Sequence, residues 1–201
     1  MKKFSPIMIC NLVLMILLLA FSLVCVVMIF GGLKPAPAGY SDAEKLAWNV
    51  YGAVNAVNIL ALACGIVYIC KGYSKQAAGF YKAFMFFLAV ASIPNIVINV
   101  LLGQDGSSII HSLPISIAIM VLKAAILLIF VFWKDLGRRN TWILFAVLLV
   151  LDVIYGFLFS DISGIRAFRV VTILSRLVTD GTIALAINGK FTDKVRRGRK
   201  V

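Results

Sequence analysis

The chain has 201 residues, of which 62% are hydrophobic and only 14% are charged, and its net charge is +12. A soluble domain carries about 45–50% apolar and about 25% charged residues, so this composition excludes an ordinary water-soluble protein. Six apolar stretches and their short loops use up the length, which leaves no room for a separate catalytic or binding domain.

The first apolar stretch, residues 7–30, contains no charged residue and is long enough for a transmembrane helix. Such a helix needs about 20 apolar residues to cross the hydrocarbon layer. Lys2 and Lys3 precede the stretch, and residues 36–38 read Ala-Pro-Ala, so a cleavable signal peptide is an alternative. A cleavable apolar region is usually about 7–15 residues long, and this one is longer. We therefore predict that the first helix is retained.

Five further spans follow in chain order. Ser41 and Glu44 form a capping box, which predicts that the second helix begins ahead of its membrane span. The five spans are predicted at residues 47–70, 80–102, 113–133, 141–159 and 170–188. A basic tail, residues 189–201, closes the chain. The predicted fold is an all-α polytopic bundle of six transmembrane helices, which form a single transmembrane domain.

The lysines and arginines outside the spans gather on one side of the predicted topology. The side with the N-terminus, the loops at residues 71–82 and 134–140, and the tail holds 14 of them, against four on the other side. Because positive residues resist translocation, we expect both termini to be cytoplasmic. The basic loops and tail then face anionic lipid head groups of the plasma membrane, and this reading is preferred to a nucleic-acid partner.

Four charged residues fall inside the predicted spans: Lys123, Asp152, Arg176 and Asp180. Each costs about 2.5–3.5 kcal/mol to insert, so such residues face partners or water. Asp152 and Arg176 have nearly the same depth in antiparallel neighbours, which predicts a direct pair. Lys123 and Asp180 are both central and form a second candidate pair. The network either fixes helix register or lines a path for a solute or protons, and the sequence leaves both interpretations open.

Uncharged polar residues extend this network into a predicted polar seam. Its candidate members are Asn55, Asn58, Asn95, Asn99, Thr172 and Thr179. Asn55 and Asn95 have similar depths, and asparagines bond across transmembrane helices for about 0.6–2 kcal/mol. Structural bonding is the default interpretation, and solute binding beside Pro94 is the alternative. The second span has Ala53, Val57, Ala61 and Gly65 at every fourth position, which predicts a narrow surface for close helix packing.

Catalytic and metal-binding signatures are missing from the sequence. There is no GxSxG, HExxH or P-loop motif, and one histidine with four cysteines lacking CxxC spacing makes no metal or redox set. We therefore predict no enzyme activity, no metal and no cofactor. Residues 180–184, Asp-Gly-Thr-Ile-Ala, resemble the start of the CDP-alcohol phosphotransferase motif. Leu185 replaces the arginine of that motif, and the later aspartates do not align.

The length, helix number, orientation and lack of an enzyme motif resemble the substrate-binding subunits of energy-coupling-factor vitamin transporters. This resemblance covers the whole chain at the level of architecture only, and it carries no individual binding residues across. The leading hypothesis is a small-solute transporter, or the substrate-binding subunit of one, acting through the seam of spans four to six. The alternative is an accessory or regulatory membrane protein that does not transport and acts through helix–helix and lipid contacts with a membrane protein partner.

Overall fold

A computed structural model describes residues 5–32, 41–72, 77–103, 113–133, 136–159, 174 and 176–188. Its helices are α1 (Pro6–Phe30), α2 (Asp42–Cys70), α3 (Ala78–Gly103), α4 (Leu113–Phe132) and α5 (Arg138–Phe159), followed by the helical segment 176–188. The predicted all-α fold class is confirmed. Each helix coincides with one of the six apolar stretches, and α2 begins directly after Ser41, as the capping box predicted.

Local sequence signals set the ends of the first two helices. The hydroxyl of Ser5 caps α1 by accepting a hydrogen bond from the main-chain N–H of Met8 at 3.3 Å. Two glycines with positive φ follow the helices, Gly32 after α1 at 69° and Gly72 after α2 at 62°. Glycine adopts this left-handed conformation without a steric penalty, so both helices end where the chain must turn back.

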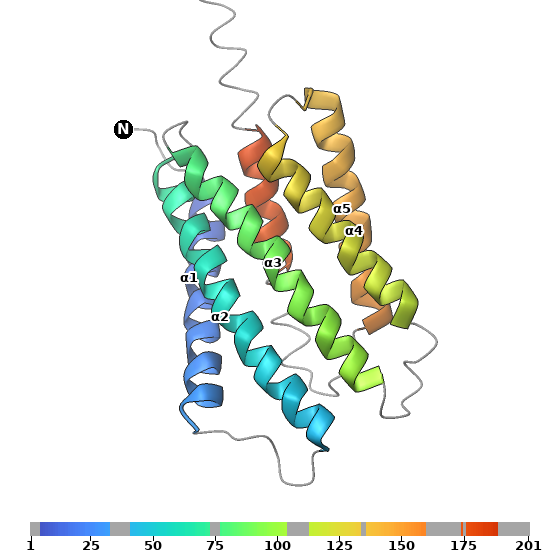
Figure 1. Cartoon of the computed structure of the whole chain (residues 1–201). Coiled ribbons are helices and arrows are strands. Elements are labelled where there is room, and N and C mark those ends of the chain that lie inside the picture. The colour runs from blue at the N-terminus through green and yellow to red at the C-terminus, as the bar shows by residue number, and fades with distance from the viewer. Residues whose placement is uncertain are drawn as a thin grey trace, which may run out of the picture.

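The helices pack in chain order and then close on themselves. α1 packs along α2, α2 along α3 and α3 along α4, whereas the contact between α4 and α5 is sparser (Figure 1). Segment 176–188 (red in Figure 1) lies behind α3 in that view. It reaches α1, because the Asn11 side chain donates a hydrogen bond to the Thr182 hydroxyl at 2.7 Å. The first and last described helices therefore adjoin.

One apolar core joins all six helical segments. Its largest fully buried members are Met15, Ile69, Phe84, Met85, Leu127, Leu148 and Ile183. At Gly65 a Cβ atom would lie only 2.4 Å from the Cε of Met15 and 3.1 Å from the Cδ2 of Phe84. The predicted close-packing surface of the second span is thus confirmed at Gly65, where α1 and α3 approach α2. Ala53, at its other end, is exposed.

The surface of α1 has the polarity expected in a membrane. Its buried residues recur at helical spacing and are Asn11, Met15, Leu18 and Ser22, so its one side-chain amide and its one hydroxyl face inward. Its outer face carries exposed large aliphatic side chains such as Ile7 and Leu17. In water this arrangement would bury polar groups and expose apolar ones, the reverse of a soluble helix.

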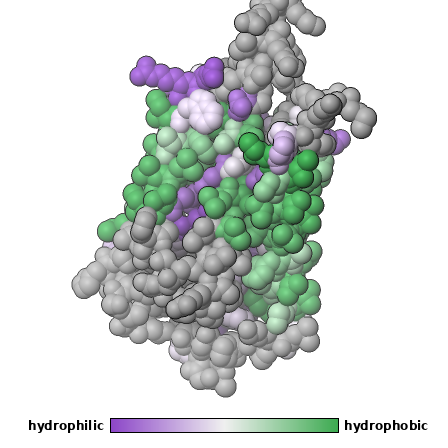
Figure 2. All heavy atoms as spheres, turned by 180° about the vertical axis from the view of Figure 1, so that it is seen from behind, coloured by the Kyte–Doolittle hydropathy of each residue, from purple (hydrophilic) through white to green (hydrophobic). Residues whose placement is uncertain are grey.

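Within the part of the chain that the structure describes, three helices are long and apolar enough to cross a membrane: Pro6–Phe30, Lys45–Cys70 and Pro114–Phe132. A shorter apolar helix covers Ala78–Pro94. Seen from behind, the bundle presents broad hydrophobic flanks with a strip of hydrophilic atoms between them (Figure 2). These features support the assignment to a membrane.

Candidate functional site

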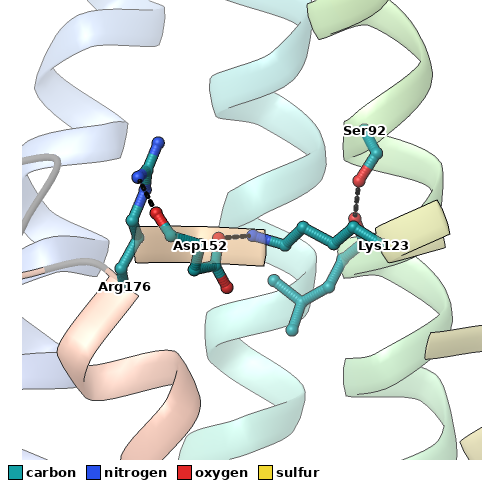
Figure 3. Close-up of polar contacts among 5 residues, drawn as sticks. Ser92, Lys123, Asp152 and Arg176 are labelled. Carbon is teal, nitrogen blue, oxygen red and sulfur yellow. Dashed lines mark hydrogen bonds and ion pairs between the residues drawn. The ribbon is translucent and has the colours of Figure 1, made fainter. Parts of the chain in front are cut away.

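An ion pair joins the middle of α4 to the middle of α5. The Nζ atom of Lys123 donates to a carboxylate oxygen of Asp152 (Figure 3). The Asp152 side chain is only 6% exposed and that of Lys123 is 26% exposed. Both lie within apolar helices, where a single charge would lack compensation from water. The pair neutralises both charges at the interface where α4 and α5 otherwise make few contacts.

Arg176 contacts the same turn of α5 from the other side (Figure 3). Its Nη1 donates to the main-chain carbonyl oxygen of Asp152 at 2.7 Å. Its guanidinium carbon lies 4.7 Å from the centre of the Tyr155 ring, which is within range of a cation–π interaction. A main-chain carbonyl oxygen has two lone pairs. The carbonyl oxygen of Asp152 can therefore accept the bond from Arg176 in addition to a hydrogen bond within the helix. Arg176 is thereby oriented without using the Asp152 carboxylate.

Asp180 completes the cluster one helical turn after Arg176. It is 8% exposed, and it interacts electrostatically with Asp152, Lys123 and Arg176. Among the residues that the structure describes, no hydrogen bond or ion pair engages its carboxylate. The four charges thus form one cluster from three helical segments, in which a single ion pair uses two of them.

The four charged residues lie near one another, but their contacts differ from the predicted pairing. The carboxylate of Asp152 binds Lys123, and Arg176 binds the main chain of Asp152 instead. The expected pair of Lys123 and Asp180 is not formed, because the lysine side chain turns to α5. Arg176 and Asp152 do meet at the same depth, as predicted. Equal depth alone does not tell whether the arginine binds the carboxylate or the main-chain carbonyl oxygen of Asp152.

The uncharged seam residues are only partly within the described chain. Asn55 is buried, and its side-chain amide donates to the main-chain oxygen of Tyr51 at 2.8 Å, within α2 itself. This bond is intrahelical, unlike the predicted bond across helices. Asn58 and Thr179 are partly buried. The side chains of Asn95 and Asn99, and the whole of Thr172, lie outside the described residues.

Sequence reasoning missed the polar contact between α1 and segment 176–188. Thr182 accepts the Asn11 bond and donates its own hydroxyl to the carbonyl of Val178 at 2.9 Å. The Asn11 side chain lies close to the backbone of segment 176–188, because a Cβ atom on Gly181 would lie 3.3 Å from the Oδ1 of Asn11. A signal was present: Asn11 is the one side-chain amide in the first apolar stretch. Such a residue inside hydrocarbon needs a partner on another helix.

Ser116 adds a buried polar atom to the face of α4 that carries Lys123. It is fully buried two turns before Lys123, and its hydroxyl has no hydrogen-bond partner among the described residues. A buried hydroxyl of this kind is a place for water or for a ligand. Figure 2 shows a strip of hydrophilic residues at the surface between the apolar flanks.

Nothing in the described ranges gathers three or more histidine, cysteine, aspartate or glutamate residues as a metal ion would require. Comparisons with protein-family models, with curated proteins and with solved structures find no match for this chain. Any function must therefore be argued from the charge cluster itself.

Proposed function

We propose that this chain is a plasma-membrane protein that binds and moves a small polar solute at the charge cluster of α4, α5 and segment 176–188. The observation that carries the proposal is Asp180, a buried carboxylate with no ion-pair partner in the described part of the chain. A buried charge without a partner is strongly destabilising. Such residues inside membranes mark substrate and ion pathways more often than packing sites.

We further propose six spans with both termini in the cytoplasm. The described part of segment 176–188 is shorter than a membrane span, and α5 carries Arg138 and Arg139 at its start in addition to Asp152. The Lys123 pair and the carbonyl bond of Arg176 offset part of the cost of burying charged side chains there. The excess of basic residues on one side of this topology supports the orientation.

The packing suggests which part of the bundle would move. α1 to α4 form a continuous, closely packed group, while α5 is joined to α4 by few contacts and by the ion pair. A charged solute bound at Arg176 or Asp180, beside Lys123 and Asp152, would alter the electrostatic balance of that pair and weaken the junction. α5 would then shift against α4, as in transporters whose gates rock around a fixed site. Solute binding and helix movement are coupled in this scheme through one salt bridge.

Solvent access at the cluster tests the proposal. In a background without the native cysteines, Thr179→Cys would be exposed to a charged, water-soluble thiol reagent in intact membranes. Leu177→Cys is the matched control, because Leu177 lies within one turn of the same helix and is 63% exposed on an apolar surface. We expect labelling at position 179 and none at position 177. Equal labelling, or labelling at neither position in folded protein, would contradict a water-filled polar seam.

A second candidate function, an accessory protein that does not transport, is favoured by one feature. An open apolar hollow on α4 is lined by Ala125, Leu128, Ile129, Phe132 and Trp133. It lies at the end of α4 away from Ser116, and its lining would suit an apolar helix of a membrane partner. Absence of labelling at both cysteine positions would favour this function over transport.

A further inference from the structure

Two opposite charges on segment 176–188 remain after the Lys123–Asp152 pair is formed. Arg176 and Asp180 are four residues apart and share a helix face, where Cβ atoms are about 5–6 Å apart. This spacing often permits a salt bridge, yet the two side chains do not form one. Arg176 is turned to α5, and Asp180 stays buried beside it. A positive and a negative group are therefore held side by side without neutralising each other directly.

Arg176 has unused bonding capacity. A guanidinium has five N–H donors, and one of them binds the Asp152 carbonyl oxygen among the described residues. The Tyr155 ring lies over one face of the guanidinium, so a further partner would bind at an edge. An edge of this planar group matches a carboxylate with two parallel hydrogen bonds. A solute carboxylate is the chemical group that fits this position.

Asp180 has the complementary capacity. An ionised carboxylate accepts only, and the described residues give this one no donor. A solute ammonium group would supply up to three donors and the missing positive charge. A metal ion is a poorer occupant, since the described residues offer no cluster of ligands.

The charge balance of the cluster favours a solute with both groups. Lys123 and Asp152 cancel, and so do Arg176 and Asp180, so the cluster is neutral when all four side chains are ionised. A simple cation or anion would leave a net charge in a region of low dielectric constant, which is costly. A zwitterion leaves the cluster neutral while it pairs both charges.

We propose that the cluster recognises a small zwitterion of the α-amino acid type, with its carboxylate on Arg176 and its ammonium group on Asp180. This inference rests on the proposed function, because a solute must first reach the seam.

A ligand panel on the purified full-length protein tests the inference. Thermal unfolding in detergent would be followed with each common protein amino acid. Each amino acid is compared with the amine that lacks its carboxylate and with the acid that lacks its ammonium group. Glycine, methylammonium and acetate form the simplest such set. We expect at least one amino acid to raise the unfolding midpoint while its two counterparts do not. No shift with any amino acid, or an equal shift with an amine or acid alone, would overturn the assignment.

Variants then place the ligand. Arg176→Gln and Asp180→Asn should each weaken binding about tenfold or more, since each removes a charge-assisted bond. Leu177→Ala is the control on the same helix and should leave binding unchanged. Unchanged binding in both charge variants would overturn the proposed placement. Water access at Thr179 without amino-acid binding would reject the zwitterion and retain the proposed function, whereas no access would reject both.

Discussion

The ion pair between α4 and α5 offers the sharpest test of the energetics. Lys123→Met and Asp152→Asn each remove one charge with little change in volume. Removing one partner of a buried pair costs about 3–5 kcal/mol in the free energy of unfolding, because the other charge stays behind. Lys123→Met leaves the Asp152 carboxylate, which is 6% exposed, without its partner. The loss in the free energy of unfolding should therefore be about 3–5 kcal/mol. Asp152→Asn strands an ammonium group that is 26% exposed, so about 2–3 kcal/mol is expected.

The double variant separates pairing from packing. The double variant has neither charge, so no buried charge is left without a partner, and it should be less destabilised than Lys123→Met. The coupling energy between the two replacements should be about 2 kcal/mol. The measurement is reversible unfolding in mixed micelles, followed by tryptophan fluorescence. A double variant whose loss equals the sum of the single losses would refute the reasoning.

A second cycle, with Arg176→Gln and Asp152→Asn, serves as the comparison. Arg176 binds the main-chain carbonyl of Asp152, and that group survives the side-chain replacement. Its coupling to the Asp152 side chain should therefore be smaller than that of Lys123. A larger coupling would mean that the carboxylate pairs with Arg176, as the sequence alone had predicted.

Two further predictions concern packing. Gly65→Val should destabilise the bundle by about 1–3 kcal/mol, because its Cβ would meet Met15 at 2.4 Å. Gly79→Val is the comparison, since a Cβ there has no neighbour within 4 Å, and equal losses in the two variants would contradict the close packing. Asn11→Ala and Thr182→Val should each cost about 0.6–1.7 kcal/mol, and the double variant should cost less than their sum. Strict additivity in that cycle, measured by the same unfolding assay, would show that the bond contributes nothing.

Much of the fold was predictable because its signals are local. Long apolar runs specify helices, and turn signals such as Gly32 and Gly72 lie where those runs stop. Membership of the charge cluster was predictable for a related reason, since charges in hydrocarbon must converge on partners or water. Arg176 and Asp152 were therefore placed at one level without any knowledge of packing.

The pairing within the cluster depends on helix rotation, which the sequence does not encode locally. A small rotation of segment 176–188 decides whether Arg176 meets a carboxylate, a carbonyl oxygen or a ring. The bond between Asn11 and Thr182 joins residues 171 positions apart, and only the closure of the bundle brings them together. In lipid, apolar helix surfaces gain no hydrophobic free energy from packing together. The closure of the bundle therefore depends on close packing at small residues and on hydrogen bonds between polar side chains.

Replacing the two charged residues of segment 176–188, Arg176 and Asp180, tests whether the charge cluster serves packing or solute binding. The segment is already held by the bond to Asn11 and by core residues such as Ile183, and each charge costs about 2.5–3.5 kcal/mol to insert. Replacing a buried charged set by apolar residues of similar size is often neutral or stabilising. If the charges serve solute binding, the double variant Arg176→Met, Asp180→Leu should lose amino-acid binding. Its free energy of unfolding should equal or exceed that of the native protein. If they serve packing, the same variant should be strongly destabilised, and the proposed solute site would be wrong.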